Sequence, residues 1–287
     1  MPAFHAQDGL PYWIDLLTHD VDAAADFYSA LLGWDTSSRT ADDADDATPV
    51  AGYRMARAQG LPVAGFIAQP ADAPAGATWV THFFTPDIDA ACARVTEHGG
   101  TVTTPPTEVQ LGRMALVLDP GDGFFGLIEP RDAEAFVSGG EPGTAVWHEL
   151  TATADTGFDT TVDFYRDVFG WTTVATTPGD GFSYVTAQVD GAPFAGLWTS
   201  DNFPPGVPNF WQTYLGVADL DATCQRVPDL GGRVLRGPWD SEFGRLALVE
   251  DPTGGTMTLC EVDEPIIEGH EGDPLEGLDL GDLGTIN

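Results

Sequence analysis

The chain has 287 residues, which at roughly 150 residues per domain is enough for two domains with hydrophobic cores of their own. Apolar residues make up 43% of it and aromatic residues 10%, a composition typical of folded globular proteins. Acidic side chains outnumber basic ones by 45 to 11. The net charge of −34 repels phosphate backbones and anionic membranes, so we expect no nucleic-acid or membrane partner.

The Lys and Cys content narrows the chemistry further. Every basic residue is Arg, so the chain has no Schiff-base amine and no phosphate-loop lysine. Cys92, Cys224 and Cys260 form no CxxC pair, which favours a reducing compartment over a disulfide framework. The first residues form no basic, apolar leader, and no apolar run reaches the roughly 18 residues that would span a bilayer. We therefore expect a cytoplasmic protein.

The first predicted module begins with a short strand that includes Trp13. Asp20 can cap the amphipathic helix that follows, and the glycine of LGW can end it. The acidic run Ala41–Pro49 is predicted to be an exposed loop. The pattern returns at WVTHFF, where Asp87 opens a second helix. The runs GTVTTPP, GRMALVLDP and FFGLIEP then read as antiparallel strands separated by turns, so each module is predicted to be βαβββ.

The whole pattern is duplicated. LGRMALVLDPGDGFFGLIEP at Leu111–Pro130 reappears as FGRLALVEDPTGGTMTLCEV at Phe243–Val262, and DFYSALLGW at Asp26–Trp34 reappears as DFYRDVFGW at Asp163–Trp171. The chain therefore consists of four modules in two halves. We predict domains at residues 1–137 and 138–265, followed by an acidic tail, 266–287, with no core of its own.

Four such modules, with DVDAAADFYSALLGW and FDTTVDFYRDVFGW in the odd ones and GRMALVLDPGDG and GRLALVEDPTGG in the even ones, resemble the vicinal oxygen chelate superfamily. That superfamily includes glyoxalase I, extradiol dioxygenases, fosfomycin-resistance enzymes and bleomycin-binding proteins. The resemblance implies an α+β fold with two cupped mixed-sheet domains, each cup made of two modules around a ligand. The WxDL and WxEL strand starts are similar to those of tandem glyoxalase-like proteins of actinobacterial type, often described as hydroxylases.

The resemblance also implies where a metal would bind, because family members use His or Gln on the first strand of a module and Glu on the last. Here those positions fall at Trp13, Val80, Gly126 and Thr258, none of which supplies a suitable ligand atom. The fourth strands of modules one and three, VAGFIAQ and PFAGLWT, hold no His or carboxylate either. We expect no metal in the standard site and predict no other cofactor.

A displaced polar set remains as the predicted catalytic group. Asp15 and His82 each lie two residues beyond an empty ligand position, on the same strand face, and Glu149 and Tyr214 correspond to them in the second half. Such a pair could serve as general base and orienting group, or could hold a cationic or hydroxylated ligand. The alternative is that these are satisfied polar residues of a small core. We expect the first cup to be active, because it alone pairs a carboxylate with a histidine.

Aromatic rings that line a concave sheet suit a flat, largely apolar ligand with a few oxygens. Arg113 and Arg245 could either clamp a ligand anion or pair with acids near the cup. The predicted ligand contacts are Trp13, Trp79, Phe83, Arg113, Trp147, Trp198, Trp211 and Arg245.

Three functions are compatible with these residues. The leading one is a small-molecule enzyme that acts on an oxygenated, partly aromatic metabolite by proton transfer or by an assisted oxygenation, as a lyase, isomerase or hydroxylase. The second is a binding protein that sequesters a toxic or antibiotic ligand, and the third is a structural or regulatory partner protein. The expected partner is a small-molecule ligand, and the chain is expected to be a monomer or a homodimer.

Overall fold

The computed structural model describes residues 3–37, 53–70, 73, 76–131, 136–153, 157–176, 182–200, 204, 206–241 and 244–263. The acidic run Ala41–Pro49 and the tail 266–287 lie outside the described residues. Over the ranges that are described, no helix has the length and apolar character needed to cross a membrane.

The elements follow the predicted modules. The first half contains, in chain order, β1 (Ala3–His5), β2 (Pro11–Thr18), α1 (Val21–Leu32), β3 (Tyr53–Ala58), β4 (Leu61–Ala68), β5 (Thr78–Phe84), α2 (Ile88–Glu97), β6 (Thr101–Val109), β7 (Gly112–Leu118), β8 (Phe124–Pro130) and β9 (Phe136–Ser138). The second half contains β10 (Ala145–Ala152), α3 (Phe158–Phe169), β11 (Thr172–Ala175), β12 (Phe182–Val189), β13 (Ala192–Ser200), β14 (Phe210–Val217), α4 (Leu220–Arg226), a 3₁₀ turn at Pro228–Leu230, β15 (Arg233–Ser241), β16 (Gly244–Glu250) and β17 (Thr256–Glu261).

The helix ends have the predicted chemistry. Asp20 accepts a 2.9 Å hydrogen bond from the backbone N–H of Ala23, and Asp87 caps α2 in the same way. The first helix ends at Gly33, whose φ of 71° lies in the left-handed region that glycine adopts without strain. Helix α3 differs, because its N-cap residue is Gly157, which has no side chain to cap it.

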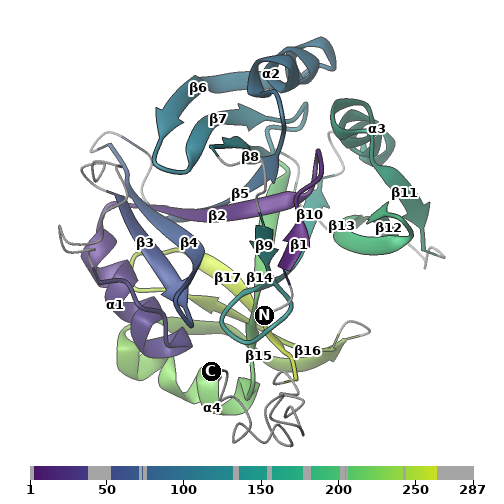
Figure 1. Ribbon diagram of the computed structural model, residues 1–287. Helices are drawn as coiled ribbons and strands as arrows, with labels where there is room; N and C mark the ends of the chain where they lie inside the picture. Colours follow the sequence, from purple (N-terminus) through teal and green to yellow (C-terminus); the bar gives the residue numbers. More distant parts are fainter. Residues whose placement is uncertain are drawn as a thin grey trace, which may run out of the picture.

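Apart from the small β1-β9 pair, the described strands form one continuous sheet with two curved parts (Figure 1). We call the first part, in the order β3-β4-β2-β5-β8-β7-β6, cup 1, and the second, β11-β12-β13-β10-β14-β17-β16-β15, cup 2. Phe124 of β8 and Phe210 of β14 are paired where the two cups join. Modules one and two therefore build cup 1, and modules three and four build cup 2. This is the α+β arrangement that the repeats predict.

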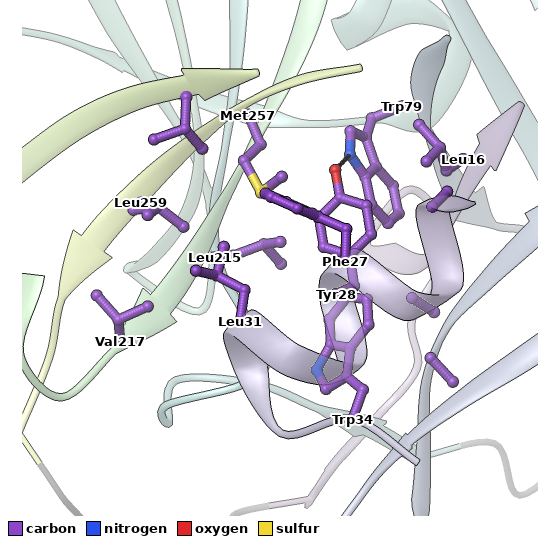
Figure 2. Packing of buried hydrophobic residues seen from close by; sticks show 14 of the residues in the cluster. Leu16, Phe27, Tyr28, Leu31, Trp34, Trp79, Leu215, Val217, Met257 and Leu259 are labelled. Atoms are coloured by element: carbon purple, nitrogen blue, oxygen red, sulfur yellow. Dashed lines mark hydrogen bonds between the residues drawn. The ribbon is translucent and has the colours of Figure 1, made fainter. Parts of the chain in front are cut away.

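The hydrophobic cores are shared between the halves, which differs from the expectation of one core per domain. One core packs Phe27, Tyr28 and Leu31 of α1 against Leu215 and Leu259 of cup 2 (Figure 2). The other combines the second module with the third, and α2 lies against α3 there. The cups thus stand back to back, with the helices of both halves around the contact. We call this side of each sheet the helix face and the opposite side the cup face.

Buried hydrogen bonds tie the helices of one half to the turns of the other. The Tyr28 hydroxyl donates to Asp251 at 2.8 Å, and the indole of Trp79 donates to the Tyr28 oxygen at 3.0 Å. The same arrangement recurs in the other shared core with Tyr165 and Asp119, at 3.1 Å. The Phe-Tyr pairs of the helices and the Asp-Pro turns of the repeats therefore meet at the contact between the cups.

Candidate functional site

Side-chain alternation places the predicted polar pair on the cup face of cup 1. Along β2, Trp13 belongs to the cluster of the cup face while Ile14 and Leu16 lie in a shared core. On the neighbouring strand β5, His82 is the direct register partner of Trp13. Asp15 and His82 therefore project from adjacent strands to the same side, as the period-two argument predicts.

Asp15 and His82 form a buried pair. The Nε2 atom of His82 lies 2.9 Å from Oδ2 of Asp15, and the side chains of His82 and Asp15 are 1% and 0% exposed. The indole N–H of Trp13 donates to the other carboxylate oxygen, Oδ1, at 3.0 Å. Trp13 therefore orients the carboxylate and leaves its second oxygen facing the imidazole.

Neither imidazole nitrogen of His82 makes a hydrogen bond of normal geometry to a residue in the described part of the chain, so Nδ1 has no partner there and Nε2 has the close approach to Asp15. Gly126 lies beside it in register on β8, and a Cβ on that glycine would stand 1.8 Å from Nδ1. Only a residue without a side chain can occupy this position while His82 keeps its place. Gly126 stands where family members carry a Glu ligand, and the space left by the missing side chain is filled by His82.

Tyr53 of β3 joins the pair over another glycine. A Cβ on Gly65 would lie 2.1 Å from Oδ1 of Asp15 and 2.3 Å from the Tyr53 hydroxyl, so the two atoms converge over that glycine. The Tyr53 hydroxyl makes no hydrogen bond of normal geometry among the described residues. Burial, and then the charge of Asp15, raise its pKa well above the ordinary value of 10.0, so the hydroxyl stays a proton donor.

Cup 2 repeats this plan with different atoms. Glu149 of β10 accepts a hydrogen bond from the Tyr214 hydroxyl at 2.8 Å and another from the Tyr184 hydroxyl at 3.2 Å. Gly196 lies below, where a Cβ would come within 2.0 Å of the Tyr184 oxygen. The carboxylate and tyrosine predicted for this cup are therefore in contact, and Tyr184 is the counterpart of Tyr53.

The surroundings of Glu149 shift the pKa values in cup 2. Burial raises the pKa of Glu149 above its ordinary value, while the hydrogen bonds from Tyr214 and Tyr184, and smaller contributions from Trp147 and Trp198, oppose that shift. Burial and the neighbouring carboxylate raise the pKa of both tyrosines far above 10. The phenols therefore act as fixed donors to Glu149 near neutral pH.

Three of the predicted ligand contacts lie on the wrong face. Trp79 packs in the first shared core, and Phe83 and Trp211 pack in the second. The reason is the same alternation that places His82 correctly, since residues at odd distances from His82 along β5, or from Tyr214 along β14, point to the helix face. The ring of Trp79 packs against Tyr28, that of Trp211 packs against Tyr165, and Phe83 packs against Trp211. Trp13, Trp147 and Trp198 remain associated with the cup faces.

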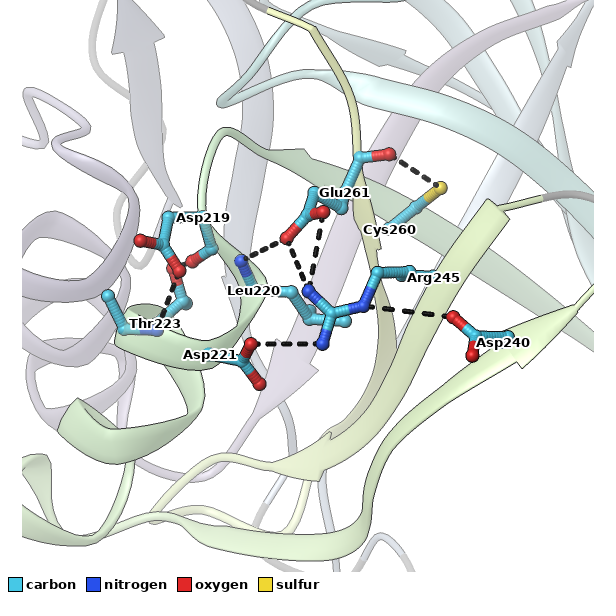
Figure 3. A network of polar contacts seen from close by, with 9 residues as sticks. Asp219, Leu220, Asp221, Thr223, Asp240, Arg245, Cys260 and Glu261 are labelled. Carbon is cyan, nitrogen blue, oxygen red and sulfur yellow. Dashed lines mark hydrogen bonds and ion pairs between the residues drawn. The ribbon is translucent and has the colours of Figure 1, made fainter.

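The two arginines are structural in this geometry. Arg245 is bonded to Asp221 at 2.9 Å and to Glu261 at 3.1 Å, and Glu261 accepts the backbone N–H of Leu220 at the start of α4 (Figure 3). Arg113 makes the equivalent contacts with Asp89 and Glu129 at the start of α2. Of the two roles expected for these arginines, the structure shows the pairing with acids, and both guanidinium groups lie at helix starts.

His148 lies on the opposite face from Glu149, as a regular strand requires. Its Nδ1 is 3.3 Å from the hydroxyls of both Thr81 and Thr213, which are 3.1 Å from each other. Thr81 and Thr213 are equivalent positions of the two halves, so this cluster lies at the centre of the contact between the cups. Burial lowers the pKa of His148 to about 3.

The donor set does not fit the metal that the fold family implies. On the cup face of cup 1, Asp15 and His82 are two ligands where such an ion wants three or four. In cup 2 the carboxylate of Glu149 is one ligand, and the side chains around it are tyrosines and tryptophans. No cluster of three or more His, Cys, Asp or Glu side chains suited to a metal occurs in the described ranges.

Tyr53 and Tyr184 were not predicted from the sequence, although a signal was present. Both lie 12 residues before a glycine, Gly65 and Gly196, in equivalent strands of the two halves. A tyrosine and a glycine that are separated by the same number of residues in both repeats indicate a tyrosine ring that lies over the strand that contains the glycine. The reason for the glycine becomes visible only when the carboxylate is placed beside it.

The fold and the sequence together define the family. The model of the Glyoxalase/Bleomycin resistance protein/Dioxygenase superfamily matches residues 11–125 and 149–258, and the chain belongs to this superfamily. It is 32% identical over 261 residues to CFP32 of Mycobacterium tuberculosis, which is provisionally named a glyoxylase, with 89% of this chain and 95% of that protein covered. It is 33% identical over 273 residues to the anthracycline biosynthesis protein DauV of Streptomyces sp. strain C5, with 89% and 94% covered.

Solved structures share the fold. The Mn(II)-bound glyoxalase from Novosphingobium aromaticivorans aligns with a TM-score of 0.61 and 17% identity, covering 90% of this chain and 85% of that one. A variant of homoprotocatechuate 2,3-dioxygenase from Brevibacterium fuscum aligns with a TM-score of 0.60 and 15% identity, covering 91% and 73%. The tandem vicinal oxygen chelate fold is confirmed, and membership of a superfamily with lyases and oxygenases supports a small-molecule enzyme.

Proposed function

We propose that cup 1 catalyses proton transfer on an oxygenated, partly aromatic small molecule, with His82 as the group that carries the proton. The observation that carries the proposal is the buried contact of 2.9 Å between Asp15 Oδ2 and His82 Nε2. A carboxylate at one nitrogen favours the tautomer with the proton on that side, which leaves Nδ1 as a base. Asp15 also stabilises the imidazolium that forms after proton removal.

The remaining polar groups of cup 1 support the same reaction. Trp13 fixes Asp15 through its indole N–H, and Tyr53 is held protonated beside the carboxylate. A protonated phenol can donate to the oxygen on which negative charge develops when a carbon next to a carbonyl loses its proton. An oxygenation that starts with the same proton removal would use the same residues.

The apolar surroundings favour an aromatic substrate without a strong anionic group. Trp13 packs with Met114 and Ile128 on the cup face, and Met55 lies against this cluster. Methionine side chains adapt to flat ligands, and no Arg of the described chain forms an ion pair with Asp15 that would prepare the site for an anion. The relatives named for anthracycline biosynthesis also support an oxygenated aromatic substrate.

Deuterium exchange tests the proposal even while the product of the reaction is unidentified. The protein is treated with a mild chelator, its metal content is measured, and it is incubated in D₂O with a panel of aromatic hydroxyketones and diketones. We expect NMR to show deuterium at the carbon next to a carbonyl, with exchange at least about 10²-fold slower for His82→Gln. Exchange that is equal in the variant, or that requires an added metal, would contradict the proposal.

A further inference from the structure

Cup 2 contains a buried carboxylate, Glu149, that forms no ion pair with a basic side chain among the described residues. Glu149 is 8% exposed, and no ion pair joins it to an Arg or His in the part of the chain that the structure describes. Asp15, its counterpart in cup 1, has His82 at 2.9 Å. A buried charge without a charged partner is costly, and the hydrogen bonds from Tyr214 and Tyr184 compensate only part of that cost.

Aromatic rings stand around this carboxylate and extend to the surface. Tyr184 is stacked with Phe182 at a centroid distance of 6.1 Å, and Phe182 lies 5.7 Å from Trp198. Phe182 is 40% exposed, whereas Tyr184 is 4% exposed. The rings therefore form a continuous row from the exposed Phe182 to Tyr184, whose hydroxyl is bonded to Glu149.

On the corresponding strand of cup 1, β4, an aliphatic residue stands in place of Trp198. By the spacing that relates Tyr53 to Tyr184 and Gly65 to Gly196, the counterpart of Trp198 is Ile67. Where cup 1 carries His82 and Ile67, the same plan carries Tyr214 and Trp198 in cup 2. The two cups have different chemistry on one backbone design.

We propose that cup 2 binds an organic ammonium ion, with the positive charge of the ligand placed between the Glu149 carboxylate and the rings of Tyr184, Trp198 and Phe182. Aromatic faces attract cations, and an ammonium group supplies the charge that Glu149 lacks. The hydroxyl hydrogens of Tyr184 and Tyr214 are directed at the carboxylate, so their oxygens keep lone pairs that can contact the positive group of a ligand. The net charge of −34 attracts cations to the surface.

This proposal is independent of the reaction proposed for cup 1, and it is tested with two ligands of equal shape. Choline and its neutral isostere 3,3-dimethylbutan-1-ol are titrated into the full-length protein, with binding followed by calorimetry and tryptophan fluorescence. Benzyltrimethylammonium serves as a second, aromatic cation. We expect saturable binding of both cations and at least about tenfold weaker binding of the neutral isostere.

Variants then locate the site. Glu149→Gln and Trp198→Ile should each weaken choline binding at least about tenfold, whereas Asp229→Asn, which removes one exposed acid on the 3₁₀ turn, should leave it unchanged. Thermal unfolding of each variant shows whether it is folded. If Glu149→Gln does not fold, the Trp198→Ile variant still tests the proposal. The proposal is overturned if neither cation binds, if the neutral isostere binds as well as choline, or if Asp229→Asn has the same effect as Glu149→Gln.

Discussion

The hydroxyl of Tyr28 donates a 2.8 Å hydrogen bond to Asp251, which lies 223 residues further along the chain. The bond joins α1 of the first half to the turn between β16 and β17 of the second. Tyr165 and Asp119 form the same bond in the opposite direction between the halves. The tyrosines and aspartates that both repeats share therefore hold the cups together. The residues that differ between the cups lie on the cup faces.

Loss of either tyrosine hydroxyl should destabilise the whole molecule. Tyr28→Phe removes the donor to Asp251 Oδ2 and the acceptor of the Trp79 indole N–H, and we expect a decrease of about 1–3 kcal/mol in the free energy of unfolding. Tyr165→Phe should have a similar effect. Urea unfolding measures both values.

Asp163→Asn is the control for that experiment, because Asp163 and Arg166 form an exposed ion pair on α3. We expect its effect to stay below about 0.5 kcal/mol. If Tyr28→Phe were no more destabilising than this control, the hydrogen bonds between the halves would not be important for stability.

Acid should weaken the contact between the cups through His148. Its pKa in the folded protein is about 3, against an ordinary value of 6.5, because burial disfavours the charged ring. Between these values only the unfolded chain binds the proton, so the free energy of unfolding falls as the pH drops below 6.5. The expected loss from this group is about 2 kcal/mol between about pH 7 and about pH 5.

The variant His148→Ile isolates this contribution, because Ile14 occupies the equivalent position in the first half. Thr81 and Thr213 can keep their mutual hydrogen bond in the variant. We expect the wild-type protein to lose about 2 kcal/mol more than the variant over that pH interval. Parallel curves of stability against pH for the two proteins would contradict the assignment.

Two glycines allow each cup to be disturbed separately. In Gly126→Ala the new Cβ would stand 1.8 Å from His82 Nδ1, and in Gly196→Ala it would stand 2.0 Å from the Tyr184 hydroxyl. We expect the first variant to slow deuterium exchange by about 10²-fold and leave choline affinity unchanged. The second should weaken choline binding and leave exchange unchanged. Equal effects of one variant on both measurements would show that the cups do not act separately.

The fold could be predicted from the sequence because duplication makes the modules visible. Asp15 and His82 could be placed on one face because strand alternation depends only on spacing. The same rule, applied to Trp79 and Phe83, would have placed them on the helix face. Their assignment to the ligand followed from residue type, since an aromatic side chain fits a core as well as a cup.

Contacts between strands that are distant in sequence could not be predicted. The shared cores depend on how the two cups pack against each other, which no local pattern indicates. Tyr53 and Tyr184 belong to strands that reach Asp15 and Glu149 only through parallel pairing of β4 with β2 and of β13 with β10. The acids that pair with Arg113 and Arg245 were likewise hidden until the helix starts were placed.

The central claim is that cup 1 carries out proton transfer through His82. Its most direct test is the rate of deuterium exchange into one active compound, measured side by side for wild-type protein, His82→Gln and Glu149→Gln after chelation. We predict that His82→Gln lowers the rate at least about 10²-fold and that Glu149→Gln stays close to wild type. A rate that survives in His82→Gln and disappears in Glu149→Gln would contradict this account and place the reaction in cup 2.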